Sequence, residues 1–413
     1  MEKFDIKGIV RKYVTNTKVI DIHTHLFPAD FGELTLWGPD ELITYHYLVA
    51  EAVRATHSDY DKFWSMYKKE QADFIFKSLF IDRSPLSEAC RGVLTTFSEL
   101  GIDLSTMSIE GFREFFKKFS IDEYIDKVFE ISGVEKVVMT NDPFNRVEVD
   151  FWKNGAGKDK RFLASLRIDT LVNDYQTARY ELINEGYNVG RSLNGIAKSE
   201  IKRFLKEKIE QMNAVYMAVS LPPDFEMPSN TTRDTIIEDC VIPIARELNK
   251  PLAMMIGVKR SVNPDLYLAG DSVGKANVET VEYLCRKYPK NKFMITMLSR
   301  ENQHELCVVA RKFNNLYLFG CWWFLNNPVL IEEITRMRFE LLGTSFMPQH
   351  SDARVLDQLI YKWKHSKIII AKVLTDKYED LFDTGWPLSE SSIEKDIKDL
   401  FGESFKKFIR FEL

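Results

Sequence analysis

The sequence predicts an α/β fold, a (β/α)8 barrel of the TIM type with a helical insertion after its first strand. Short apolar runs alternate with amphipathic helical stretches along the 413 residues, which is the pattern of repeated βα units. Candidate metal ligands also lie near both ends of the chain, with His25 and Asp352 separated by 352 − 25 = 327 residues. They can meet only if the first strand lies beside the last, as it does in a closed barrel.

Eight apolar runs are the expected barrel strands. Helical stretches such as 277–288 and 301–313 separate the later runs, so each connection can be a right-handed crossover. The expected strands are Val19–His23, Lys136–Thr140, Phe162–Arg167, Val215–Ser220, Leu252–Ile256, Phe293–Met297, Leu316–Gly320 and Thr344–Gln349.

The chain exceeds the length of about 250 residues that is usual for such a barrel. We expect a single barrel domain over residues 1–413 that carries two additions. The first and second strands lie 136 − 23 = 113 residues apart, and residues 39–132 are rich in Phe, Leu and Tyr at helical spacing. This span predicts an inserted helical subdomain over the barrel mouth. Residues 389–411 predict a C-terminal helix that packs on the barrel.

Composition and charge exclude several classes of function. The net charge of −5 and the scattered Lys and Arg residues provide no basic patch, so we expect no nucleic-acid partner. The start resembles no signal peptide, and the most apolar runs are too short or too charged to cross a bilayer. We therefore expect a cytoplasmic protein without a membrane partner. The sequence leaves open whether the protein forms a homo-oligomer.

The segment Asp21–His25 follows a short apolar run and carries two histidines. Alternate side chains of a strand share a face, so His23 and His25 project together. Two such histidines alone are more often ordinary hydrogen-bonding residues. Asp352 could supply a third ligand and leave open positions for a substrate on a divalent metal. The mixed nitrogen and oxygen set suits zinc and also Mn²⁺, Fe²⁺ or Ni²⁺.

Five motifs occur in order over nearly the whole chain. They are the histidine pair, Tyr45-His46-Tyr47, Arg167 with Asp169, Phe319–Phe324 and Ser351–Arg354. Their order, spacing and placement at strand ends resemble the uronate isomerases of the amidohydrolase superfamily. The resemblance implies an amidohydrolase-type barrel and a hexuronate substrate. It also implies interconversion of D-glucuronate with D-fructuronate and of D-galacturonate with D-tagaturonate.

The fourth, fifth and sixth expected strands contain no Lys, His, Asp or Glu. Many hydrolases of the superfamily carry metal ligands there, and more familiar uronate isomerases carry a histidine where this chain has Met255. The difference indicates a divergent branch with one divalent metal ion. We expect zinc, held by His23, His25 and Asp352, and no organic cofactor.

The resemblance and the chemistry of the reaction together predict the roles of the site residues. Asp352 would accept the ring hydroxyl proton when the sugar opens. Tyr47 would take the proton from C2, with Arg167 as the cation that makes this phenol acidic enough. Arg354 would hold the uronate carboxylate, and the two arginines could exchange roles. Further substrate contacts are expected from Trp322, Trp323 and His46.

Two alternatives remain open from the sequence. A metal-dependent hydrolase or decarboxylase of the same superfamily would keep the first-strand histidines and Asp352, but we would expect histidines on later strands to bind or activate water. A non-catalytic sugar-acid binding protein would keep the site without needing a metal or a base.

Overall fold

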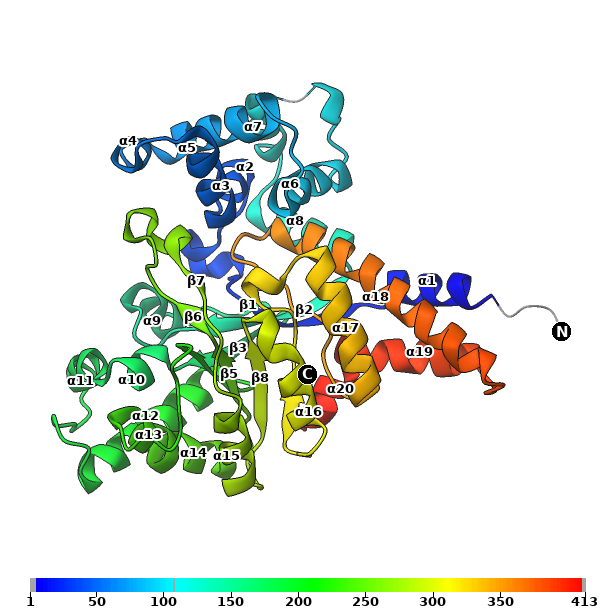
Figure 1. Cartoon of the computed structure of the whole chain (residues 1–413). Coiled ribbons are helices and arrows are strands. Elements are labelled where there is room, and N and C mark those ends of the chain that lie inside the picture. The colour runs from blue at the N-terminus through cyan, green and yellow to red at the C-terminus, as the bar shows by residue number, and fades with distance from the viewer. Residues whose placement is uncertain (1–4, 107, 411–413) are drawn as a thin grey trace.

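The computed structural model describes residues 5–106 and 108–410. Within them, seven parallel strands form one sheet in the order β1-β2-β3-β4-β5-β8-β9 (Figure 1). The strands are β1 (Val19–Thr24), β2 (Val134–Asn141), β3 (Phe162–Arg167), β4 (Met217–Leu221), β5 (Leu252–Ile256), β8 (Phe293–Met297) and β9 (Leu316–Leu318). The curled parallel sheet with its crossover helices confirms the predicted α/β barrel class.

Helices connect the strands, and local sequence explains where several of them begin. Asn194 and Asn327 each accept a hydrogen bond from a first-turn backbone N–H of the helix that follows. A short antiparallel hairpin, β6 (Val258–Lys259) and β7 (Ser272–Val273), follows β5 and encloses the 3-10 segment η5 (Pro264–Gly270). The connecting helices are α9 (Arg146–Lys153), α10 (Asp169–Asn173), α11 (Tyr175–Asn184), α12 (Gly195–Met212), α13 (Thr232–Ile236), α14 (Ile242–Glu247), α15 (Glu279–Lys287), α16 (Gln303–Ala310) and α17 (Pro328–Leu342).

The prediction of a regular eighth strand at Thr344–Gln349 is wrong, although this segment still closes the barrel. It forms one isolated parallel bridge, between Phe319 and Met347. Met347 donates to the Leu318 carbonyl at 3.0 Å, and further along the chain Asp352 donates to the His23 carbonyl at 3.1 Å. Pro348 has no N–H to continue a ladder, which explains the interruption. The segment therefore joins β9 to β1 through only a few hydrogen bonds.

The chain between β1 and β2 is largely helical. Rings of Phe97 and Phe112 lie 3.9 Å apart and form part of its core. In α4 (Tyr60–Trp64), Trp64 Nε1 donates to the Asp265 carbonyl of η5 at 2.7 Å, which connects this region to the loop after β5. In Figure 1 the helices labelled α2 to α7 lie together beyond one end of the sheet. The helices are α2 (Pro39–Ile43), α3 (His46–Thr56), α4 (Tyr60–Trp64), α5 (Lys68–Phe76), α6 (Glu88–Glu99), α7 (Ile109–Phe116) and α8 (Ile121–Ser132).

Helices at the two ends of the described chain pack together. The N-terminal helix α1 (Ile6–Asn16) contacts α18 (Gln358–Asp383) and α19 (Glu390–Lys398). After α19, a π-helical turn η8 (Asp399–Glu403) leads into α20 (Ser404–Ile409).

The segment from α19 to α20 lies at the ends of the strands opposite to those that carry His25 and Asp352. The ring of Phe405 packs 6.5 Å from that of Tyr216, which directly precedes β4. Residue 411, the last of the predicted C-terminal helix, lies outside the described residues. Within the described ranges, no helix combines the length and apolar character needed to span a membrane.

Candidate active site

His23 and His25 lie where β1 ends. Every residue of β1 is buried, and the side chain of His25, one position beyond the strand, is 16% exposed. The two imidazole rings lie 5.3 Å apart, edge to face. The backbone N–H of His25 donates to the Ala353 carbonyl at 2.7 Å, so the loop after the eighth segment is joined to the end of the first strand.

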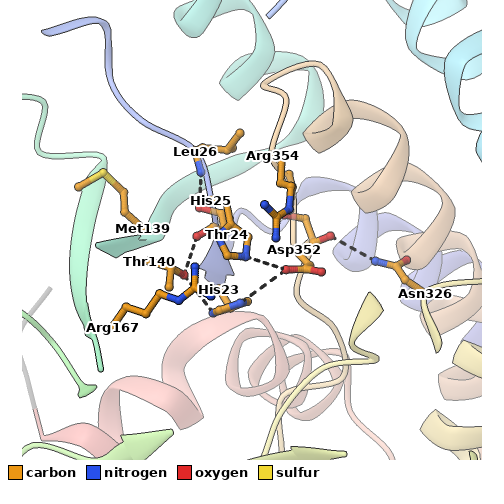
Figure 2. Close-up of polar contacts among 12 residues, drawn as sticks. His23, Thr24, His25, Leu26, Met139, Thr140, Arg167, Asn326, Asp352 and Arg354 are labelled. Carbon is orange, nitrogen blue, oxygen red and sulfur yellow. Dashed lines mark hydrogen bonds and ion pairs between the residues drawn. The ribbon is translucent and has the colours of Figure 1, made fainter. Parts of the chain in front are cut away.

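Asp352 meets both histidines at one carboxylate oxygen (Figure 2). Its Oδ1 lies 3.6 Å from His23 Nε2 and 3.3 Å from His25 Nε2. Ligand atoms of the three residues all lie within 4.8 Å of one another. No described residue gives Asp352 Oδ1 a hydrogen bond of good geometry, although this atom is buried. Two imidazole nitrogens around an unsatisfied carboxylate oxygen fit a divalent metal ion.

The protonation states of these groups also suit a metal. Burial, followed by the charge of Arg354, lowers the pKa of His25 to about 3, so the ring is neutral near pH 7. Burial alone would raise the pKa of Asp352. The polar contacts with His23 and His25 outweigh it and hold that pKa well below its ordinary value. Neutral imidazole and ionised carboxylate are the forms that bind metals.

Buried Asp21 holds the loop that carries Asp352. Its carboxylate accepts hydrogen bonds from the Ser351 backbone N–H at 3.0 Å and from Trp363 Nε1 at 2.8 Å. Asp352 itself has a φ of 51°, in the left-handed region that a non-glycine residue rarely adopts. The geometry of this candidate metal site therefore depends on groups other than His23, His25 and Asp352.

The segment Tyr45–Tyr47, at the start of α3, forms an aromatic wall beside these groups. The His46 ring lies 5.7 Å from that of Trp323, and the Tyr47 ring lies 6.2 Å from that of Phe324. No well-formed hydrogen bond from the described residues reaches Tyr47 Oη, His46 Nε2 or Trp323 Nε1, although all three atoms are buried. Unpaired buried polar atoms are costly, so we expect a bound molecule to satisfy them.

The two predicted arginines lie in different surroundings. Arg167 ends β3 and binds Asp169 through Nη2 at 2.6 Å and Nε at 2.9 Å. Burial and neighbouring charges raise the pKa of Tyr47 well above its ordinary value, and Arg354 is the cation that lowers it. Figure 2 draws Arg354 on the Asp352 side of the histidines and Arg167 on the side of Thr140.

No protein-family model and no curated protein matches the chain. Solved structures do match. The crystal structure of a uronate isomerase from Bacillus halodurans C-125 is 54% identical to this chain, with a TM-score of 0.97. The match covers 98% of this chain and 96% of that one. The chain belongs to the uronate isomerase family.

More distant members of the family share the fold. A uronate isomerase from Thermotoga maritima is 18% identical, with a TM-score of 0.75, over 98% of this chain and 97% of that one. A glucuronate isomerase from Caulobacter crescentus is 13% identical, with a TM-score of 0.79, over 100% and 96%. At these identities the likeness supports the fold alone. The family resemblance predicted from the sequence is confirmed.

Other residues near the site of this uronate isomerase are also buried, but not all of them contact the aromatic wall formed by Tyr45–Tyr47. Met255 is buried in β5 and offers no metal ligand. Trp322 and Trp323 are both buried, and Trp323 is the one that contacts His46. The His350 ring packs edge to face on that of His23, 5.3 Å away.

Sequence reasoning missed three buried polar residues behind the ligands. Asp21 accepts a hydrogen bond from the Ser351 backbone N–H. Gln358 and Lys362, both on α18, form hydrogen bonds with backbone groups of the loop that carries Asp352. Asp21 has one usable signal, because it shares a strand face with His23 in the same motif. The other two lie in a helix with no motif around them, and only their burial identifies them.

Proposed function

We propose that this protein interconverts a hexuronate aldose with its ketose, D-glucuronate with D-fructuronate and D-galacturonate with D-tagaturonate. One observation carries the proposal. In a chain that belongs to the uronate isomerase family, the His23–His25–Asp352 group lies close enough to the unpaired hydroxyl of Tyr47 for the charge of Asp352 to raise the pKa of this phenol. Metal ligands, a phenol and two guanidinium groups are the parts that the reaction needs.

The reaction moves two protons after the sugar ring opens. The proton on C2 leaves and returns at C1, and the proton on O2 passes to O1, so the aldehyde becomes an alcohol and C2 becomes a ketone. A divalent ion held by His23, His25 and Asp352, for which we propose zinc, would supply positive charge to substrate oxygens. Asp352 accepts the ring hydroxyl proton during opening, because its carboxylate is ionised and lies beside both histidines.

Tyr47 is the proposed base at C2. Of the two role assignments that the sequence left open, the charge of Arg354, which lowers the pKa of Tyr47, supports the one in which Arg354 is the cation near this phenol. Arg167 then faces the substrate carboxylate. Its Nε and Nη2 are already bound to Asp169, so Nη1 is the nitrogen left for the substrate. Trp323 and His46 complete the proposed wall of the site.

Proton NMR in D₂O tests this function. Zinc-loaded protein is incubated with D-glucuronate and, separately, with D-galacturonate. We expect the ketose to appear with deuterium at C1, since an exchangeable base carries the proton. Asp352→Asn should lower the rate by about 10²-fold or more. Wild-type protein that turns over neither sugar, with Zn²⁺ or Mn²⁺ bound, would overturn the proposal and direct attention to hydrolysis and decarboxylation.

A further inference from the structure

A buried lysine lies against the loop that carries Asp352 and Arg354. Lys362, in the first turns of α18, is only 3% exposed. Its Nζ donates to the Ser351 carbonyl at 2.5 Å and lies 3.5 Å from the Asp352 carbonyl oxygen. Among the described residues, Asp352 and Asp21 are the carboxylates whose charges act on this ammonium, and the ion pairs of Asp352 are with His23 and His25 rather than with Lys362. Burying an ammonium group without a paired carboxylate costs free energy, so packing alone does not explain a lysine at this position.

The two carbonyl groups explain what the ammonium can do. One precedes and one follows the Cα of Asp352, so a donor that reaches both restrains the backbone on each side of that residue. Asp352 adopts a φ of 51°, in the left-handed region that non-glycine residues rarely adopt. Lys362 thus contacts the backbone at the strained residue of the loop.

A second side chain on the same helix face holds the other half of the loop. Gln358 lies four residues before Lys362, which places the two on one side of α18. Its Oε1 accepts hydrogen bonds from the backbone N–H groups of Arg354 at 2.9 Å and Val355 at 3.2 Å. The helix therefore binds the loop at both ends of the segment that carries the carboxylate and the guanidinium.

We propose that Lys362 is a positioning residue of the isomerase reaction, which acts through Asp352 and does not touch the substrate. By fixing the backbone of Asp352, it directs the carboxylate oxygen toward His23 and His25. The inference rests on the function proposed above, because it assigns Lys362 a part in that reaction.

The test compares Lys362→Met with Lys364→Met. Lys364 lies on the same helix, is 44% exposed on its side chain and pairs with Glu99 at the surface. We expect Lys362→Met to lower both kcat and zinc affinity by about 10- to 100-fold, with little change in KM, because groups that orient ligands have effects of this size. Lys362→Arg should recover part of both losses, since it restores a buried cation with several donors. Lys364→Met should leave both unchanged.

Thermal unfolding of the zinc-free variants separates positioning from general stability. Lys362→Met removes a buried charge, which stabilises the protein, and also removes the hydrogen bond to the Ser351 carbonyl, which destabilises it. Because these two effects largely offset one another, we expect the melting midpoint of Lys362→Met within a few degrees of wild type. Wild-type kcat and zinc affinity in Lys362→Met would overturn the proposal. Should that variant not fold, Lys362→Gln replaces it, and failure of both to fold would also overturn the proposal, since Lys362 would then serve folding.

Zinc affinity is measured by competition with a chelator and does not depend on turnover. If the wild-type protein binds zinc but isomerises neither uronate, the proposed function fails, while the affinities still decide whether Lys362 positions Asp352. If the wild type isomerises and Lys362→Met matches it in both measurements, only the inference about Lys362 fails.

Discussion

Tyr47 has the chemistry of a base but an environment that opposes ionisation. Burial comes first among the causes that raise its pKa, and the charges of Tyr45 and Asp352 add to it. The sequence predicted a cation beside this phenol and named Arg167, but the sequence could not choose between two arginines without distances. In the structure, the charge of Arg354 is the one that favours the phenolate.

The ionisation of Tyr47 predicts a pH dependence. In the proposed mechanism only the phenolate of Tyr47 can take the C2 proton, and a raised pKa keeps the phenolate the minor form near neutrality. We therefore expect kcat to increase with pH, by up to about tenfold per unit between roughly pH 6 and 9. Tyr47→Phe should lose about 10²-fold or more in kcat. Tyr45→Phe, which removes the neighbouring hydroxyl, should keep the slope. A rising profile that survives in Tyr47→Phe would assign the base to another group.

The C-terminal segment shows how an apolar stripe can be predicted while its shape is not. The pattern over 389–411 predicted one helix, but the described part is divided into α19, η8 and α20. The break is at Gly402, whose φ is 149° and where a Cβ would approach Ile20 Cδ1 to 2.8 Å. The backbone at Gly402 lies close to Ile20 of β1, and this contact explains the break. The apolar pattern of the segment itself contains no sign of it.

A substitution at Phe405 tests whether packing of α20 on the barrel stabilises the protein. The residue is fully buried against Tyr216, so Phe405→Ala should leave a cavity and lower the free energy of unfolding by about 3–5 kcal/mol. The matched control is Lys407→Ala, whose side chain is 63% exposed and paired with Asp399. We expect that change to cost less than about 1 kcal/mol. Urea unfolding measures both. Equal midpoints for the two variants would contradict the packing role of α20.

The barrel closes where the segment Thr344–Gln349 and the loop after it lie between β9 and β1, and we call this junction the seam. The proposed metal site lies at the seam. The eighth segment contributes only an isolated bridge, while His25 and Asp352 stand on either side of the seam. A metal bound by both would link the first strand to the last. Since such a metal binds the folded state and not the dispersed ligands of the unfolded chain, it should stabilise the entire barrel.

Thermal unfolding with and without zinc measures this stabilisation. With free zinc at about 100 times its dissociation constant, we expect a gain of about 2.7 kcal/mol, which corresponds to roughly 3 °C in the melting midpoint for a chain of this length. His25→Ala should abolish the gain. His304→Ala, which removes an exposed histidine on α16, should retain it. An equal zinc effect in both variants would place the stabilising ion elsewhere.

The sequence by itself determined the barrel class, the positions of seven strands and the family, because periodicity and short motifs are local and survive without coordinates. It also predicted His23, His25 and Asp352 as one group, since their positions at strand ends imply that they meet. Only the tertiary structure decided the interrupted eighth segment, the surroundings of the two arginines and the contacts of Asp21, Gln358 and Lys362 behind the ligands. These features depend on distances between residues that are far apart in the chain. The role of a buried charged side chain depends on its neighbours, and the sequence does not show which residues those are.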